Sequence, residues 1–413
     1  KRSETIDRPE NPRWIIYDRY IPRGNIYSQN GNLIASTQGQ IGSYSRKINY
    51  DPLSTVIGYT NPLYGQSNLE ESLYPYLRGL EGVPYADVWW NQRLYNQPPL
   101  GLDLRLSLNL TQQGIVDVLM DDVKGSAVLM NAKSGEIYVM ASHPFYNAET
   151  LDQDWQDLIQ DKNAPLLNRA TQGAYSLGTA TTSLLLPAFI DSQDLDLSSL
   201  SLKQRVDFSC LNVARGSDSN IKGLQYGCTR SVQELENSIS GEKIIKTLES
   251  FGIYSSPPIQ LPILEPSLAP DLIIDPANYF SSTNSLLVSP LQMALTSSVL
   301  TNKGFLPCPR IVNSYQDKTG EWIAFPAICE PNEVLNRNLT DQVIYLLQAE
   351  SELFWFTIGY ASTSTGEPLT WYLGGTLPEW QGTPLAVAIV LEKYDPILAQ
   401  ELGRLLLTQA TEY

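Results

Sequence analysis

The feature that most constrains the fold of this chain is a pair of apolar segments joined by a short polar turn. Residues 125–130 (GSAVLM) and 137–140 (IYVM) flank the turn at residues 131–135 (NAKSG). Two apolar runs of strand length on either side of a glycine-containing turn predict an antiparallel hairpin. The fold must therefore contain a sheet, and this hairpin is part of it.

The segments around the hairpin predict an α+β fold. In chain order we expect a strand, a helix, a mainly helical region, a helix, two late strands and a closing amphipathic helix: residues 102–110, 112–120, 154–250, 291–300, 371–374, 385–392 and 396–407. Strands followed by helices, and then by strands with a terminal helix, favour a sandwich in which the two kinds of element are segregated.

The 413 residues are enough for two or three domains and a sizeable core. Residues 1–20 carry little pattern, and we expect them to be a stub left after a cleaved leader or a deleted membrane anchor. Residues 21–100 are rich in turns and are expected to form a β-containing module, followed by the main domain at 101–413. No apolar run reaches the ~18 residues that span a bilayer.

Charge and histidine content exclude several classes of function. Lysine and arginine number 28 against 44 acidic residues, a formal net charge of −16. Nucleic acid and anionic lipid surfaces would repel such a chain. His143 is the only histidine, which argues against a multi-histidine metal site and a histidine-based triad. We expect no metal and no cofactor.

The four cysteines form two pairs that are close in sequence, Cys210 with Cys228 and Cys308 with Cys329. No C-x-x-C motif is present, which excludes a zinc ribbon or a thioredoxin-type site. An even number in short loops favours two disulfides in an oxidising compartment. The alternative is four buried free thiols in a cytosolic protein.

Several short motifs occur in a fixed order along residues 21–392. The first is residues 22–31 (PRGNIYSQNG), and the others are residues 56–60, 65–70, 77–82, 104–109, 132–137, 140–144, 289–294 and 306–310. Together they resemble the class B penicillin-binding proteins, the monofunctional peptidoglycan transpeptidases. The resemblance implies a penicillin-binding-protein/β-lactamase-like domain with a five-stranded antiparallel sheet flanked by helices. It also implies an elongated N-terminal pedestal at 21–100.

The family's chemistry uses a serine in an S-x-x-K motif. The serine attacks a D-Ala-D-Ala or β-lactam carbonyl, and the lysine one helical turn later takes its proton. The matching run here is residues 168–182 (NRATQGAYSLGTATT), which places Thr179 at the serine and Thr182 at the lysine. Thr179 keeps a hydroxyl, but Thr182 is not a base in the relevant range.

The family's second motif, S-x-N, is expected on a helix before residues 241–245. The nearest string, Ser238-Ile239-Ser240, lacks the asparagine. A literal S-T-N at residues 282–284 precedes the late helix, and we interpret it as a coincidence.

The third motif, K-[ST]-G, is expected on the strand before residues 371–374. The stretch at 356–362 (FTIGYAS) contains Thr357 and Gly359 but no lysine. Two literal matches, at residues 133–135 and 318–320, fall in turns and are expected to be chance occurrences.

Two other features have structural interpretations. We expect His143 to be a turn histidine at the end of the hairpin strand. Five aromatic residues near the candidate site strand are expected to pack in the core, and the alternative is a filled or remodelled cleft: Phe354, Trp355, Phe356, Trp371 and Tyr372.

All three catalytic motifs are therefore degenerate while the scaffold motifs persist. We expect an inactive homologue of penicillin-binding proteins, outside the cytoplasm in the cell envelope and anchored by an N-terminal helix. It would be a scaffold or regulator beside a membrane-embedded glycan polymerase or other cell-wall synthesis proteins. Two alternatives stay open: an active D,D-transpeptidase that uses Thr179, and a non-catalytic module that binds peptidoglycan stem peptides.

Overall fold

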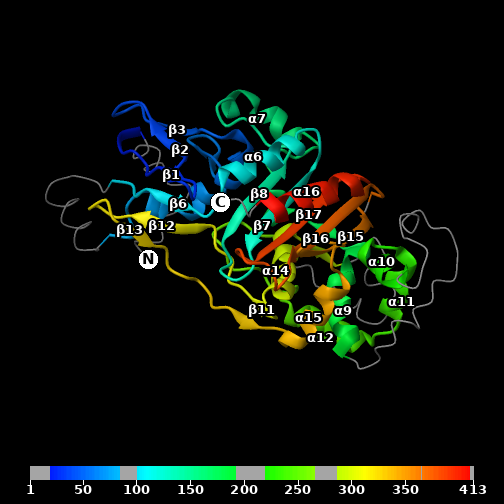
Figure 1. Cartoon of the computed structure of the whole chain (residues 1–413). Coiled ribbons are helices and arrows are strands. Elements are labelled where there is room, and N and C mark those ends of the chain that lie inside the picture. The colour runs from blue at the N-terminus through cyan, green and yellow to red at the C-terminus, as the bar shows by residue number, and fades with distance from the viewer. Residues whose placement is uncertain (1–18, 84–99, 192–218, 266–285, 364, 410–413) are drawn as a thin grey trace.

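A computed structural model of the chain describes residues 19–83, 100–191, 219–265, 286–363 and 365–409. Its centre is a five-stranded antiparallel sheet in the order β15-β16-β17-β7-β8 (Figure 1). The strands are β7 (Gly125–Asn131), β8 (Ile137–His143), β15 (Phe354–Ser362), β16 (Pro368–Thr376) and β17 (Leu385–Leu391). The predicted hairpin and the five-stranded antiparallel sheet are confirmed.

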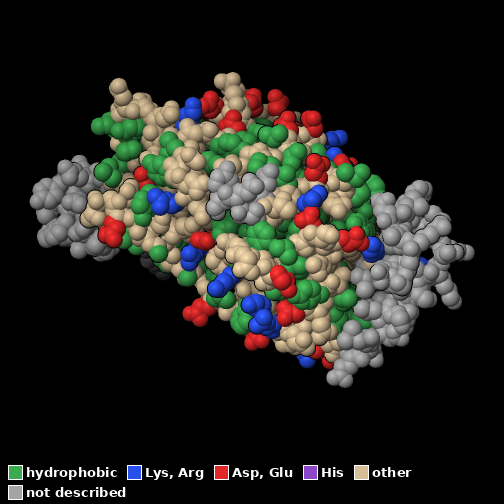
Figure 2. All heavy atoms as spheres, viewed as in Figure 1, with side chains coloured by type: hydrophobic (Ala, Val, Ile, Leu, Met, Phe, Trp, Pro, Cys, Tyr) green, Lys and Arg blue, Asp and Glu red, His purple; other side chains and the backbone are tan. Residues whose placement is uncertain are grey.

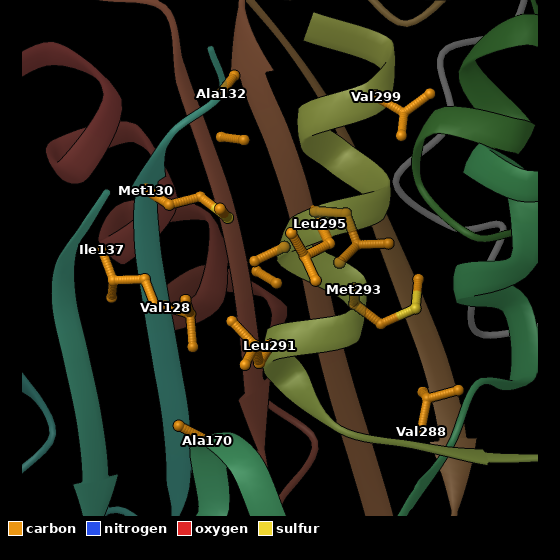
Figure 3. Close-up of a cluster of buried hydrophobic side chains, with 14 of the residues drawn as sticks. Val128, Met130, Ala132, Ile137, Ala170, Val288, Leu291, Met293, Leu295 and Val299 are labelled. Carbon is orange, nitrogen blue, oxygen red and sulfur yellow. The ribbon is translucent and has the colours of Figure 1, made fainter. Parts of the chain in front are cut away.

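Helices cover both faces of this sheet because its strands are apolar on both sides. Val128 and Met130 belong to one buried cluster with α14 (Pro290–Thr301), whereas Ala127 and Leu129 belong to another with α6 (Leu110–Leu119) and α16 (Pro396–Gln409). Successive strand residues point to opposite faces, which produces this division. Figure 3 shows α14 lying against the face that Val128 and Met130 share.

Capping residues decide where two of the predicted helices begin. Ser289 and Gln292 form a capping box, so α14 is slightly longer than the predicted 291–300. Asn109 caps α6 by accepting from the amides of Thr111 and Gln112. The strand predicted at 102–110 is therefore wrong in length: β6 covers only Leu104–Leu106, because the last leucine already belongs to the helix.

A second, six-stranded sheet has the order β13-β12-β6-β1-β2-β3. Its strands are β1 (Ile26–Tyr27), β2 (Leu33–Gln38), β3 (Ser45–Ile48), β6, β12 (Val312–Gln316) and β13 (Trp322–Ala324). β1 pairs in parallel with β6, and β12 lies on the other side of β6. Strands from both sides of the predicted boundary at residue 100 thus share one sheet, which joins the N-terminal segment to the main domain.

The remaining elements are short helices, turns of 3-10 helix and two-residue strands. The helices are α2 (Ser54–Ile57), α3 (Asn68–Ser72), α4 (Tyr74–Leu77), α7 (Leu151–Gln160), α8 (Arg169–Gln172), α9 (Thr182–Asp191), α10 (Ser219–Gln225), α11 (Thr229–Asn237), α12 (Gly241–Ser250) and α15 (Arg337–Leu346), with η1 (Asp51–Leu53) and η2 (Gly178–Thr181). The strands are β4 (Thr60–Asn61), β5 (Gly65–Gln66), β9 (Tyr175–Ser176), β10 (Leu287–Val288), β11 (Phe305–Leu306) and β14 (Asn332–Glu333). The mainly helical region predicted at 154–250 contains α7 to α12 within its described residues, interrupted by loops and the short strand β9.

A disulfide joins Cys308 to Cys329, with the Cα atoms 5.6 Å apart, as the sequence predicted. It closes a loop that carries β12 and β13 into the six-stranded sheet. The other predicted pair includes Cys210, which lies outside the described residues. Within the described segments, no helix is both long and apolar enough to cross a membrane.

Candidate active site

Thr179 lies where the 3-10 turn η2 runs into α9, beside the edge strand β15. The two approach so closely that a Cβ on Gly178 would lie 2.1 Å from the carbonyl oxygen of Tyr360. Gly178 also has a φ of +50°. Only glycine satisfies both conditions without strain. The predicted nucleophile position is therefore pressed against the outer strand of the central sheet.

The hydroxyl of Thr179 is bonded to the backbone of that strand. Its Oγ1 accepts a hydrogen bond from the Tyr360 amide at 2.7 Å and can donate to the Tyr360 carbonyl oxygen at 3.5 Å. The residue is only 8% exposed. A nucleophile must direct a lone pair at an incoming carbonyl, but this oxygen is turned toward the sheet edge.

Thr182 is fully buried and does not face Thr179 as a base would. Its Oγ1 donates to the Thr179 carbonyl oxygen at 3.1 Å, the back-bond that a threonine commonly makes in a helix. The side-chain oxygen of Thr179 therefore receives no help from Thr182 in losing its proton. Tyr360, which is next to Thr179, is not a base at neutral pH either, because burial and the nearby Tyr394 raise the pKa of its phenol.

The outer side of β15 is bonded at both of its ends. Near the start of the strand, the Ala349 amide donates to the Phe354 carbonyl at 2.9 Å, and the Phe356 amide donates to the Leu347 carbonyl at 3.1 Å. At the other end, the Ser176 hydroxyl donates to the Ser362 carbonyl at 2.6 Å. These even-numbered residues direct their backbone groups away from β16, as alternate residues of an antiparallel edge strand do.

The middle of the same edge is covered by the segment between α10 and α11. A Cβ on Gly227 would lie 2.3 Å from the Ile358 carbonyl oxygen and 2.8 Å from Thr179 Oγ1, and the residue has a φ of +62°. Gln225 holds the segment in place by donating from Nε2 to the Leu347 carbonyl at 2.9 Å. An extended peptide that bonds to this edge would have to displace the segment.

Sequence reasoning missed Gln225 and Gly227 as site residues. The available signal was the Gly227-Cys228 step between two helical patterns, since a glycine at a helix end commonly takes a positive φ. The helix that follows starts with Thr229-Arg230-Ser231. This run has a hydroxyl at the first position of an S-x-N pattern and a serine in place of the asparagine.

The structure brings the third-motif residues to Thr179. Gly359 packs closely on the turn that carries Thr179: a Cβ on Gly359 would lie 2.4 Å from both the nitrogen and the Cα of Ala180. Thr357 is fully buried, and its Oγ1 donates to the Leu224 carbonyl at 3.3 Å. Thr357 bonds to the protein's own backbone, and Gly359 packs against it.

The structure does not bring Ser238 and Ser240 to this place. Ser238 is the C-terminal cap of α11, and its hydroxyl donates to the Leu235 carbonyl at 2.6 Å. Ser240 is exposed at the start of α12. Gly227 lies just before the other end of α11, and nine helical residues span roughly 13 Å.

The other singled-out residues have structural roles. His143 is the last residue of β8, at the end of the hairpin strand as predicted, but it belongs to the strand and not to a turn. It is buried, and its Nε2 lies 2.8 Å from Asp117 Oδ1. All five aromatic residues near β15 are buried in the core as predicted. The tripeptides at 133–135 and 318–320 lie in the predicted turns, and the tripeptide at 282–284 lies outside the described residues.

Residues 125–348 match the model of the penicillin-binding protein transpeptidase domain, so the chain belongs to that family. A curated relative, the peptidoglycan D,D-transpeptidase PbpA of Mycolicibacterium smegmatis, is 24% identical over 344 residues, which are 74% of this chain and 68% of the relative. The peptidoglycan D,D-transpeptidase MrdA of Escherichia coli K12 is 26% identical over 149 residues, 34% of this chain and only 22% of the relative.

Solved structures agree on the fold. The imipenem acyl-enzyme complex of penicillin-binding protein A from M. tuberculosis superposes with a TM-score of 0.80 at 20% identity, covering 96% of this chain and 99% of that one. The D,D-transpeptidase domain of a peptidoglycan glycosyltransferase from Eggerthella lenta gives 0.75 at 19% identity, covering 94% and 98%.

Proposed function

We propose that this penicillin-binding-protein homologue does not acylate and acts as a scaffold or regulator of peptidoglycan synthesis. The observation that carries the proposal is the 2.7 Å hydrogen bond from the Tyr360 amide to Thr179 Oγ1. Acyl transfer needs an activated oxygen and free backbone donors for the developing oxyanion. Among the residues that the structure describes, no side-chain base bonds to this oxygen, and the Tyr360 amide that faces it is already bonded.

The covered edge of β15 supports the same proposal independently of the missing base. With Gly227 over Ile358 and Thr179 on Tyr360, a substrate backbone finds no open pair of groups in the middle of this strand. This observation also weighs against the stem-peptide module, because that function would reuse the same edge. The second alternative, acylation of Thr179, requires both the turn and the covering segment to move.

The family context supplies the rest of the proposal. Relatives carry the name peptidoglycan D,D-transpeptidase, which supports a role in cell-wall synthesis. We propose that the chain works in the cell envelope, outside the cytoplasm, with a membrane anchor at its N-terminal side. The Cys308–Cys329 disulfide fits an oxidising compartment. A membrane-embedded glycan polymerase or another cell-wall synthesis protein is the proposed partner.

A fluorescent penicillin tests the catalytic part directly. The protein should show no covalent label on a denaturing gel, next to an active transpeptidase as a positive control. A label that disappears in Thr179→Ala would overturn the proposal and favour the active enzyme. With no label, a thermal shift with disaccharide-peptides would favour the binding module over a protein scaffold.

A further inference from the structure

The six-stranded sheet ends at β3, and a groove runs along the open side of that strand. The groove has a volume of about 710 Å³. One wall is the segment 43–48, which contains β3, and the other is formed by residues 58–62 and 148–152. The groove lies between the N-terminal segment and residues 148–152 of the main domain, and no residue of the Thr179 site lines it.

The backbone of β3 presents unused groups to this groove. The Asn49 amide donates to the Ile34 carbonyl at 2.7 Å, so Asn49, Lys47 and Ser45 bond to β2 in the alternating pattern of antiparallel strands. Arg46 and Ile48 then direct their amides and carbonyls away from β2. Among the described residues, these groups have no backbone partner on the groove side. An edge of this kind can accept another strand.

The charges around the groove indicate which strand it would accept. Four cationic side chains line the groove against two carboxylates: Arg19, Arg23, Arg46 and Lys47 against Glu149 and Asp152. Arg23 and Arg46 also bond to the fully buried Glu70, at 2.8 and 2.6 Å. Nη2 of Arg46 is buried and has no hydrogen-bond partner. At the rim, Lys47 pairs with Glu149 at 2.8 Å, and both side chains are partly exposed.

The wall of the groove that faces β3 carries two acidic side chains, Glu149 and Asp152. Figure 2 shows acidic side chains gathered over α7, whose first two residues, Leu151 and Asp152, are part of the second wall. A carboxylate in the groove is therefore repelled from α7 and attracted toward β3, where the arginines and Lys47 lie.

We infer that the groove along β3 binds an extended peptide segment of a partner protein, which adds to the sheet as a seventh strand and places a carboxylate side chain near Lys47 and Arg46. The backbone groups of Arg46 and Ile48 would supply affinity, and the cations would supply selectivity for acidic segments. The inference does not rest on the absence of acylation, because it involves a different surface and would hold equally for an active enzyme.

The test uses fluorescein-labelled peptides on the whole protein, measured by fluorescence polarisation. The probe is fluoresceinyl-β-alanyl-Thr-Glu-Val-Glu-Val-Thr-amide, since threonine and valine favour extended backbone. Two control peptides have the same length. One has lysine in place of glutamate, and in the other every second backbone amide nitrogen is methylated and cannot donate a hydrogen bond. We expect saturable binding of the probe, and at least tenfold weaker binding of both controls. Equal binding of the three peptides, or no binding of the probe at millimolar concentration, would overturn the inference.

Two further measurements locate the binding. Lys47→Glu should weaken binding of the probe at least tenfold. Lys133→Glu should leave binding unchanged, because Lys133 is exposed at the tip of the distant β7–β8 hairpin. Hydrogen exchange at the Arg46 and Ile48 amides should slow when the probe binds. Binding that is indifferent to Lys47→Glu, or that slows exchange elsewhere but not at these amides, would contradict strand addition at β3.

Discussion

The hydroxyl oxygen of Thr179 lies 2.7 Å from the amide nitrogen of Tyr360 and accepts a hydrogen bond from it. This contact joins the nucleophile position of the family to the strand along which a substrate would lie. Acyl transfer requires a directed oxygen and an open donor, and the proposal of an inactive homologue rests on this bond because it occupies both groups. The same bond stabilises the fold, which makes it accessible to measurement without a substrate.

Replacing Thr179 by valine keeps the shape of the side chain but leaves the Tyr360 amide without its partner. We expect a loss of about 1–3 kcal/mol in the free energy of unfolding, measured by urea denaturation, as for other partly buried unsatisfied donors. Thr182→Val is the matched control. It removes only a back-bond to a helical carbonyl and should cost less. Equal losses in the two variants would mean that the Thr179–Tyr360 hydrogen bond contributes no more to the free energy of unfolding than the back-bond of Thr182.

Restoring the two missing residues should not restore activity. In the double variant Thr179→Ser/Thr182→Lys, the new lysine enters a fully buried position, and the segment at Gly227 still covers the strand edge. We expect no penicillin adduct and a stability loss of several kcal/mol, because a buried unpaired ammonium is costly. Thr383→Lys, at an exposed position, should change stability by less than about 0.5 kcal/mol. Rapid acylation of the double variant would show that the edge is open to substrates.

Gly227→Ala tests the covering segment itself. The added Cβ would collide with the Ile358 carbonyl at 2.3 Å in a backbone that already has a positive φ. Gly31→Ala is the matched control, since Gly31 has a φ of +81° but nothing within 4 Å of the new Cβ. The control should cost about 1 kcal/mol, and Gly227→Ala clearly more. The Tyr360 amide should also exchange faster in Gly227→Ala alone, and unchanged exchange there would contradict a covered edge.

The Cys308–Cys329 disulfide should stabilise the connection between the two sheets. It closes a loop with a sequence separation of 21 residues, for which chain entropy predicts about 3 kcal/mol. The double variant Cys308→Ser/Cys329→Ser should melt at a lower temperature, and reductant should lower the melting temperature of the parent toward it. If the double variant melts like the oxidised parent, the bond has no such role.

Alkaline pH should destabilise the protein partly through Tyr50. Burial, followed by the charge of Asp117 and a 2.7 Å hydrogen bond to its carboxylate, raises the pKa of this phenol above its ordinary value near 10. A group whose pKa is raised by folding contributes stability below its unfolded pKa and loses it as the pH rises further. Tyr50→Phe should therefore flatten the fall in stability above pH ~10. At pH 7 it should cost about 1 kcal/mol through the lost hydrogen bond. An unchanged slope would contradict this role.

Much of the central sheet could be predicted from the sequence because its strands are long apolar runs with clear turns between them. Residues 125–140 show this best, since hairpin pairing is local and depends on the turn. The strand predicted at 102–110 is longer than the observed strand Leu104–Leu106, because the alternating leucines continue into the helix that Asn109 caps. The contribution of β12 and β13 to the N-terminal sheet could not be predicted, because such pairing is set by contacts distant in sequence.

Only those residues of the candidate site that follow from the spacing of the motifs could be predicted from the sequence. The positions of Thr179 and Gly359 followed from the order of motifs, and the structure brings them together on adjacent elements. The bond to Tyr360 depends on the distance between η2 and β15, and no local pattern encodes this distance. Gly227 is close to Thr179 for the same reason, although the two residues are 48 positions apart.

The central claim is that Thr179 is held against β15 and does not form an acyl-enzyme. Intact mass spectrometry after long incubation with a large excess of penicillin tests this claim most directly. We expect the protein's mass to stay unchanged while an active transpeptidase in the same tube gains one penicillin. A gain of one penicillin by this protein, absent from Thr179→Ala, would show that Thr179 forms an acyl-enzyme.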